Sequence, residues 1–203
     1  MDKPAFTTLE TIAIPLDRRN VDTDQIIPAR FLRKPRAAGM AQYLFHDLRA
    51  DAEGRARPDF VFNDPAFAGA GIIVARENFG SGSSREAAVY ALWDSGIRAV
   101  VAPSFGDIFH SNALKNGLLP VTLPADIIEG LLRALIAEPG RTMRVDLQAQ
   151  TVGLVGQQAC SFDICPFQKL LLLTGQDELG YTLALEEKVR AFESGRAITE
   201  PWL

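Results

Sequence analysis

The chain has 203 residues, of which 47% are hydrophobic and 23% charged, with a net charge of -4. This is an ordinary composition for a globular domain, and the acidic balance argues against nucleic acid as the main partner, because phosphate backbones attract basic surfaces. No apolar run is long enough to cross a membrane. The N-terminus lacks the charged-then-apolar pattern of a secretion signal. We therefore expect a cytoplasmic protein with neither nucleic-acid nor membrane partners.

The residues that commonly bind metals are few and scattered. The sequence has two cysteines, Cys160 and Cys165, and two isolated histidines, His46 and His110. Without a sign of secretion, reduced thiols are expected. Two thiolates cannot complete a tetrahedral metal site or an iron–sulfur cluster. The sequence therefore predicts that this chain alone holds no metal.

The first third of the chain predicts strands separated by polar turns. Residues 8–16 (TLETIAIPL) alternate and predict a strand, and residues 20–28 (NVDTDQIIP) predict a polar turn before a short apolar segment. Residues 36–49 suit either a short helix or an ordered loop. A strand fragment is expected in residues 55–65, and the apolar run 72–75 predicts a buried strand.

The rest of the chain alternates between helix and strand signals. A helix is expected from about Ser84 to Ser95, with Ser83 and Glu86 spaced as a capping box and Gly96 as the glycine that follows the helix. Further segments predict, in order, a strand, a helix, a strand, a helix, a hairpin and a helical end: residues 98–105, 107–117, 118–123, 125–138, 143–156 and 164–203. This order indicates one α/β domain with a mixed sheet. Residues 185–203 form a helical C-terminal extension in this interpretation.

A glycine- and serine-rich loop precedes the helix expected near residue 84. It contains Gly80, Ser81, Gly82, Ser83, Ser84 and Arg85. One interpretation is a turn in which Ser83 caps the helix and the glycines adopt positive φ. The other is an anion site, in which the N–H groups at the helix start and the Arg85 guanidinium hold a carboxylate. Such donors also stabilise a serine alkoxide, which otherwise is too poorly populated to act as a base.

Two other segments contain clusters of polar residues. Asp22 and Asp24 flank Thr23 in a segment that suits an Asx turn, or that supplies a carboxylate to orient an arginine or serine. Spacing alone does not decide between these two interpretations. The segment 102–117 contains Asp107, which suits a helix cap, together with Ser104, Asn112 and Lys115.

Four motifs, in this order, carry a resemblance to a known family. They are NVDTDQIIP, ARENFGSGSSREAA, VVAPSFGDIFHSNALKNGLLPV and TGQDELGYTLAL. Together they resemble the small subunits of 3-isopropylmalate dehydratases, which are similar to the swivelling fourth domain of aconitase. The resemblance extends from about Leu9 to Leu185.

The resemblance implies a fold, a partner and a reaction. The fold is the swivelling β/β/α domain of the aconitase superfamily. The partner is a separate large subunit that carries a [4Fe–4S] cluster, one iron of which acts as a Lewis acid on the leaving hydroxyl. The reaction converts 2-isopropylmalate to 3-isopropylmalate through an alkene, in leucine biosynthesis. The resemblance thus implies a hydro-lyase that is active only as a pair of unlike chains.

The resemblance also assigns roles to individual residues. Ser83 is the base that removes the carbon-bound proton, and Arg85 binds a substrate carboxylate. Ser84 helps to orient the anion. Asp24, which ends the D-T-D motif, lines the site.

The sequence departs from the family pattern at several positions. Ala87 replaces the histidine of S-R-E-H, and Ser81 stands where cysteine is usual. In the substrate loop, Ala37 falls where an arginine is expected, with Arg36 one position earlier, so that either Arg36 takes this role or no residue does. Two alternatives follow: a paralogue that acts on another malate-type acid, such as citramalate or dimethylmalate, or a non-catalytic anion-binding module.

Overall fold

The computed structural model describes residues 4–36, 39–82 and 85–199, and within them the side chains of all but residues 197 and 198. These ranges form a seven-stranded mixed sheet in the order β4-β3-β2-β1-β5-β6-β7. The strands are β1 (Thr8–Leu16), β2 (Ile72–Ala75), β3 (Ala99–Ala102), β4 (Leu119–Thr122), β5 (Thr142–Asp146), β6 (Thr151–Leu154) and β7 (Cys160–Ser161).

Helices and short 3₁₀ turns connect and cover the strands. The helices are α1 (Thr23–Ile26), α2 (His46–Arg49), α3 (Glu86–Asp94), α4 (Asp107–Lys115), α5 (Ala125–Ala137), α6 (Pro166–Thr174), α7 (Glu178–Leu183) and α8 (Glu186–Thr199). The 3₁₀ turns are η1 (Ala29–Phe31), η3 (Ala41–Tyr43), η4 (Val61–Asn63) and η5 (Pro65–Phe67).

Strand β1 joins a parallel half of the sheet to an antiparallel half. Its C-terminal residues 13–16 pair in parallel with β2, and the parallel pairing continues through β3 to β4. Its N-terminal residues 8–12 pair antiparallel with β5, which pairs in turn with β6. One strand of nine residues therefore belongs to two ladders, and all four parallel strands end at the same edge.

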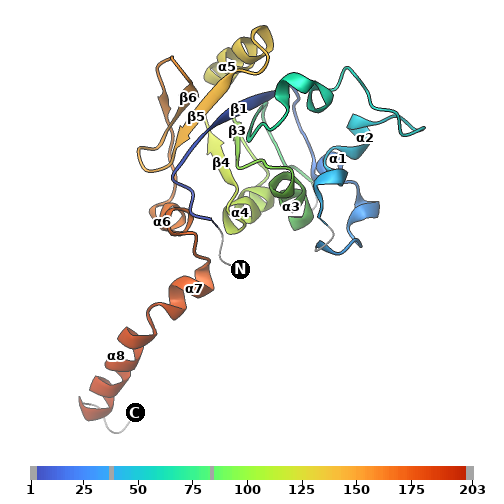
Figure 1. The fold of residues 1–203 in the computed structure, drawn as a ribbon. Helices are drawn as coiled ribbons and strands as arrows, with labels where there is room; N and C mark the ends of the chain where they lie inside the picture. Colours follow the sequence, from blue (N-terminus) through green and yellow to red (C-terminus); the bar gives the residue numbers. More distant parts are fainter. Residues whose placement is uncertain (1–3, 37–38, 83–84, 200–203) are drawn as a thin grey trace.

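The parallel strands are buried on both faces. In β2, Ile73 and Ala75 pack in the core that contains the apolar residues of α3 and α4, whereas Ile72 and Val74 pack in the core beneath α5. Figure 1 shows α3 and α4 together near one side of the sheet and α5 at another. A strand covered on both faces needs an unbroken apolar run, which is the sequence of β2. The predicted α/β fold with a mixed sheet is confirmed.

The strand fragment expected in residues 55–65 is wrong. This segment forms the 3₁₀ turns η4 and η5 instead. The Asn63 side-chain amide donates to the carbonyl oxygens of Arg49 and Arg57, at 2.7 and 2.9 Å, and closes the turn. Phe60 and Phe62 place their rings 5.8 and 4.7 Å from the ring of Phe45. Beyond an isolated bridge between Ala50 and Ala56, aromatic burial and a side-chain amide therefore replace ladder hydrogen bonds here.

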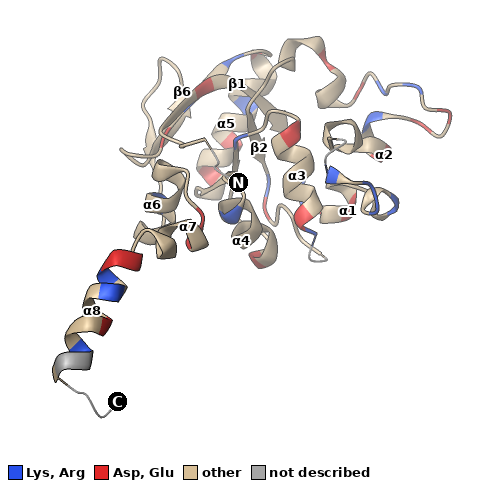
Figure 2. Cartoon of the chain, turned by 60° about the horizontal axis from the view of Figure 1, so that its bottom comes forward, with Lys and Arg blue, Asp and Glu red and all other residues tan. Residues whose placement is uncertain are grey.

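The C-terminal helices differ in how they pack. Helix α6 buries Leu171 and Leu172, and the Phe6 N–H donates to the Leu172 carbonyl oxygen at 2.8 Å. Helices α7 and α8 run away from the body (Figure 1). Every residue of α8 whose side chain is described is exposed, and both acidic and basic residues are distributed along the helix (Figure 2). No helix in the described residues is both long and apolar enough to cross a membrane.

Ending the chain after Leu185 is expected to change the free energy of unfolding by no more than about 0.5 kcal/mol, because exposed residues contribute little to stability. Ending it after Cys165 removes the buried Leu171 and Leu172 as well, and is expected to cost more than about 3 kcal/mol. Urea unfolding of the two truncated chains tests the predicted division into one domain and a helical extension. Equal losses in both would contradict it.

Candidate functional site

Three loops meet where the parallel strands β1, β2 and β3 end. They are residues 17–22 after β1, residues 76–82 after β2 and residues 103–106 after β3. The carboxyl ends of parallel strands are the usual place for a binding site in an open α/β sheet, because successive loops converge there. The first sequence motif begins in the first of these loops, and the second and third motifs contain the other two.

The middle loop is hydrogen-bonded through its main chain to both neighbours. On one side, the Gly80 N–H donates to the Val21 carbonyl oxygen at 2.7 Å, and the Thr23 N–H donates to that of Ser81 at 2.9 Å. On the other side, the Phe79 N–H donates to the Ser104 carbonyl oxygen at 3.1 Å. The parallel ladder thus continues beyond the strands and fixes the backbone of all three loops.

Glycine is required at position 80 for close packing. Its φ is +73°, and a Cβ atom there would lie 2.2 Å from Cγ of Phe109 on α4. Gly106 is similarly constrained, since a Cβ atom there would lie 2.6 Å from the Gly80 carbonyl oxygen. The glycines therefore let α4 and its preceding loop press against the middle loop.

Polar side chains reinforce the contact between the loops. The Asn78 N–H donates to the Ser104 hydroxyl at 2.9 Å, and the Asn78 side-chain amide donates to that of Asn20 at 2.8 Å. Asn78 itself has a φ of +63°, a left-handed conformation that asparagine tolerates. In this arrangement Ser104 stabilises the loop backbone.

Arg85 and Asp24 form an ion pair across the loops. The Arg85 guanidinium donates to Oδ1 of Asp24, which also accepts from the Ala29 N–H at 2.8 Å. These two hydrogen bonds, that of Arg85 first, hold the pKa of Asp24 below its usual value, so its carboxylate is charged at neutral pH. The Arg85 side chain is 18% exposed and that of Asp24 60%. Arg85 has five N–H donors, so the pair leaves others for a second anion.

The start of α3 differs from the prediction. Ser83 and Ser84, the expected base and its neighbour, lie outside the described residues. The helix begins at Glu86 with Arg85 as its N-cap residue, so Glu86 is not at the third helical position that a capping box with Ser83 needs. The Glu86 carboxylate instead accepts from the side-chain amide of Asn116 at 2.7 Å. The Glu86 carboxylate, which a capping box would direct to the start of the helix, thus makes a tertiary contact instead.

The end of α3 confirms the prediction for Gly96. This glycine has a φ of +92° and follows the C-cap residue Ser95. The Gly96 N–H donates to the Trp93 carbonyl oxygen and that of Ile97 to the Leu92 carbonyl oxygen, both at 3.0 Å. These are the two hydrogen bonds of a Schellman motif.

Arg36, which precedes α3 by a long stretch of chain, contacts a side chain of that helix. It takes no part in the ion pair between Arg85 and Asp24. Its Cζ atom is 3.5 Å from the centre of the Tyr90 ring. Tyr90 was not among the predicted site residues. The sequence offered one indication of Tyr90: it lies four residues after Glu86, and residues four apart lie on the same face of a helix.

The residues of α4 also differ from expectation. Gly106, not Asp107, is the N-cap residue, and Asp107 is the first helical residue, where a carboxylate still favours the positive end of the helix. Burial lowers the pKa of His110, with Asp107 opposing the shift, so the imidazole is neutral at neutral pH.

The two cysteines lie away from the three loops. Cys160 begins β7, and Cys165 is the N-cap residue of α6; both are unpaired. Within residues 4–36, 39–82 and 85–199, no group of three or more His, Cys, Asp or Glu residues is placed to hold a metal ion. The described residues therefore do not fit an iron–sulfur cluster.

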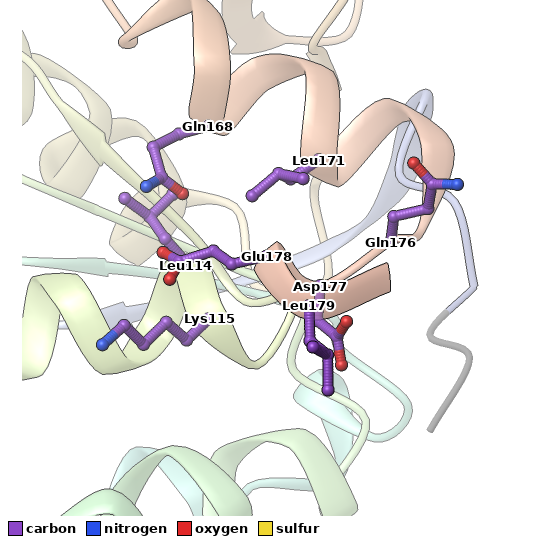
Figure 3. Close-up of a pocket in the computed structure, with 8 residues that line it drawn as sticks. All are labelled: Leu114, Lys115, Gln168, Leu171, Gln176, Asp177, Glu178 and Leu179. Atoms are coloured by element: carbon purple, nitrogen blue, oxygen red, sulfur yellow. The ribbon is translucent and has the colours of Figure 1, made fainter. Parts of the chain in front are cut away.

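A cavity lies between the far end of α4 and the helices α6 and α7 (Figure 3). Its volume is about 280 Å³, and its lining includes Leu114 and Lys115 of α4 and Glu178 and Leu179 of α7. Asp24, Arg36 and Arg85 do not line it, whereas Lys115 of the third motif does. Helix α4 separates this cavity from the three loops, because the loop after β3 enters the helix at its opposite end.

Comparison with known proteins places the chain in a class of domains. Residues 3–126 match the aconitase C-terminal domain family. A solved structure of a 3-isopropylmalate dehydratase from Methanocaldococcus jannaschii has a TM-score of 0.65 and 27% sequence identity, and the match covers 92% of this chain and 99% of that one. The swivel-domain fold expected from the motifs is thereby confirmed.

Two curated relatives give the particular family. The 3-isopropylmalate dehydratase small subunit of Rhodospirillum centenum is 45% identical over 197 residues, which cover 97% of each chain. That of Phenylobacterium zucineum is 47% identical over 200 residues, which cover 98% of each. The chain belongs to the family of 3-isopropylmalate dehydratase small subunits.

Replacing Gly80 by alanine is expected to destabilise the protein by about 3 kcal/mol or more, because the new methyl group both meets Phe109 and is held at positive φ. Gly82→Ala is the matched control. It shares the positive φ of +92° but meets no atom closer than 3.6 Å, so a loss of about 1–2 kcal/mol is expected. Urea unfolding measures both. Equal losses would show that close packing at Gly80 is not the constraint.

Proposed function

We propose that this chain is the small subunit of a hydro-lyase that isomerises 2-isopropylmalate to 3-isopropylmalate through the alkene in leucine biosynthesis. The single observation that carries the proposal is the Arg85 guanidinium, held by Asp24 where three interlocked loops converge. Membership of the small-subunit family over nearly the whole chain supports it. A cytoplasmic location belongs to the same proposal.

The proposed partner is a large subunit that carries the [4Fe–4S] cluster and supplies a Lewis acid when the complex is formed. Two observations of the described residues support this division. They offer no group of ligands suited to a cluster, and the Asp24 end of the site is largely exposed, so that a second chain has access to it. In this proposal the small subunit binds and orients the acid and moves a proton.

Ser83 is the proposed base for the proton on the carbon beside a substrate carboxylate. A serine oxygen removes such a proton only when its anion is stabilised by nearby donors. Arg85 follows two residues later and provides a permanent positive charge. As the proton leaves, negative charge moves onto the substrate carboxylate, so an arginine bound there stabilises the transition state more than the bound acid. Ser84 is proposed to orient the same anion.

Asp24 is proposed to hold Arg85 in place. Its low pKa keeps it charged at neutral pH, so the guanidinium has a fixed partner before the substrate arrives. An incoming carboxylate then meets an arginine that has already been oriented, with part of its ordering entropy already lost on folding. The Arg85 side chain itself keeps 18% of its surface exposed.

A second candidate is the same chemistry on another malate-type acid, such as citramalate or dimethylmalate. The observation that favours it is the contact of Arg36 with Tyr90, in a loop whose sequence departs from the family pattern. Turnover of 2-isopropylmalate, citramalate and dimethylmalate by the complex with its large subunit distinguishes the candidates. A complex that forms and converts none of them would support a non-catalytic anion-binding module.

Replacing Ser83 by alanine is expected to abolish turnover while leaving assembly with the large subunit intact, because only the proton acceptor is removed. The measurement is alkene absorbance with the purified complex, with size-exclusion chromatography as the control for assembly. Undiminished turnover in the variant would remove Ser83 as the base.

The Arg85→Lys change is expected to raise KM about tenfold or more, because lysine keeps the charge but lacks the planar fork that binds a carboxylate through two hydrogen bonds. Steady-state kinetics of the complex measure the effect. Asp24→Asn is the companion variant. It removes the charge of the partner but leaves the arginine, so a smaller rise is expected. An unchanged KM in Arg85→Lys would contradict carboxylate binding at this residue.

A further inference from the structure

Arg76 binds two carboxylates at the start of the middle loop. It is the first residue after β2, and Asp17 is the first residue after β1. The Nε atom of Arg76 donates to Oδ1 of Asp17, and its Nη1 atom donates to Oε2 of Glu129 at 2.7 Å. The Arg76 side chain is 23% exposed, less than either carboxylate. One arginine therefore joins the ends of two parallel strands to α5.

Helix α5 gives this arginine a fixed partner. The helix starts shortly after β4, at the edge of the sheet where the three loops lie, and Glu129 is in its second turn. Its neighbours Ile128, Leu131 and Leu132 are buried in the core on the face of the sheet opposite α3 and α4. Arg76 thus connects the loops of the candidate site to an element that is packed on the other side of the sheet.

Main-chain hydrogen bonds lead from Arg76 along the two loops toward the candidate site. The Arg76 N–H donates to the loop after β1 at 3.2 Å, and the Asn20 N–H donates back to the middle loop at 3.0 Å. The hydrogen bonds of Gly80 and Thr23 described above continue the series. Thr23 directly precedes Asp24, the carboxylate that holds Arg85. Arg76 therefore stands at one end of a ladder whose other end is next to Asp24.

The arrangement supplies orientation rather than stability. Each carboxylate is more than a third exposed, and ion pairs of this kind add little to the free energy of unfolding. The guanidinium is planar, however, and its nitrogens hold the two carboxylates in fixed directions. Its hydrogen bonds, that to Asp17 first, raise the pKa of Arg76, so the side chain stays charged.

We propose that Arg76, held by Glu129, is a positioning residue that fixes the ladder between the loop after β1 and the middle loop before the substrate arrives. The proposal rests on the function proposed above and adds the anchor of its site. Arg76 does not touch the substrate in it, but acts through the ladder on the backbone next to Asp24. Glu129 lies outside all four sequence motifs, so no local pattern connected it with the site.

Three variants and a matched control test the anchor. Arg76→Met removes the charge and keeps an apolar stem, whereas Arg76→Lys keeps the charge but lacks the planar fork. Glu129→Gln replaces only a charged oxygen, and it keeps the test available if Arg76→Met does not fold. Glu138→Gln is the control, because Glu138 pairs with Arg141 at 3.5 Å at the opposite end of α5.

Amide hydrogen exchange in the full chain reports on the ladder without the large subunit. Exchange at Asn20, Gly80 and Thr23 is expected to be about tenfold faster or more in Arg76→Met, because hydrogen bonds to a charged group are lost. A smaller increase is expected in Glu129→Gln, which leaves Asp17 in place. Glu138→Gln is expected to exchange at the wild-type rate at all three amides.

Kinetics of the complex with the large subunit separate positioning from folding. A loop that is in place for only part of the time lowers the apparent affinity by that fraction, and bound substrate restores it. Arg76→Met is therefore expected to raise KM for 2-isopropylmalate about three- to tenfold and to change kcat by less than about twofold. A variant that is merely less folded loses active enzyme, which lowers kcat and leaves KM unchanged. Arg76→Lys is expected to lie between Arg76→Met and the wild type.

The double variant tests whether Glu129 acts through Arg76. If it does, Arg76→Met combined with Glu129→Gln has the same KM as Arg76→Met alone, because the second change removes the partner of a group that is already absent. Additive losses in KM would show that Glu129 acts independently of Arg76.

Other results would also overturn the proposal. Unchanged exchange in Arg76→Met and Glu129→Gln means that the ladder does not depend on the anchor. Faster exchange with unchanged KM means that the anchor is structural only. If the wild-type complex converts none of the three acids named above, the proposed function fails and the kinetic part of this inference fails with it. Exchange at Asn20 and Gly80 still decides in that case whether Arg76 fixes the loops.

Discussion

The main-chain ladder that extends past the end of β2 is the constraint on which the site depends. Through it, one loop hydrogen-bonds to the loops on both sides, at Val21 and at Ser104. This close approach is possible only because position 80 has no Cβ atom, since Phe109 occupies the space where one would lie. The backbone of Phe79, Gly80 and Ser81 is therefore fixed by packing and hydrogen bonds that involve no charged side chain. In the proposed function, the geometry of the site rests on this rigid scaffold.

The candidate site next to these loops contains an ion pair whose two members differ in exposure. Arg85 is largely buried, whereas the carboxylate that holds it is mostly exposed. A partly buried arginine that is paired with an exposed aspartate has an ordered position, and the aspartate is open to a second subunit or a substrate. The pair adds little to stability, because the exposed carboxylate is well solvated. Its value in the proposed function is orientation.

Much of the fold could be predicted from local patterns, and the failures have a common physical cause. The alternation in β1, the apolar run of β2 and the glycine after α3 were sufficient to predict these elements. Burial of a side chain and a positive φ depend on the type of the residue at that position, which the sequence shows directly. The strand expected near Phe60 was wrong because distant aromatic rings and the Asn63 amide offered better partners than a sheet edge. The capping box failed for the same reason, since Asn116 takes the Glu86 carboxylate. Local motifs fail where a long-range partner competes for the same group.

Long-range contacts also limited how much of the candidate site could be predicted from the sequence. A carboxylate that orients an arginine was one of two interpretations of the segment that contains Asp24. Spacing could not decide between them, because Asp24 and Arg85 lie far apart in the sequence and only the fold brings them together. Tyr90 gave even less signal, because a tyrosine in an amphipathic helix is usually a core residue. Asp94 is different, since an acidic residue at the wrong end of a helix conflicts with the helix dipole and can be recognised in the sequence. Such a conflict indicates that a tertiary contact compensates for it. In α3 the compensating contact is the Met40 N–H of the loop that carries Arg36.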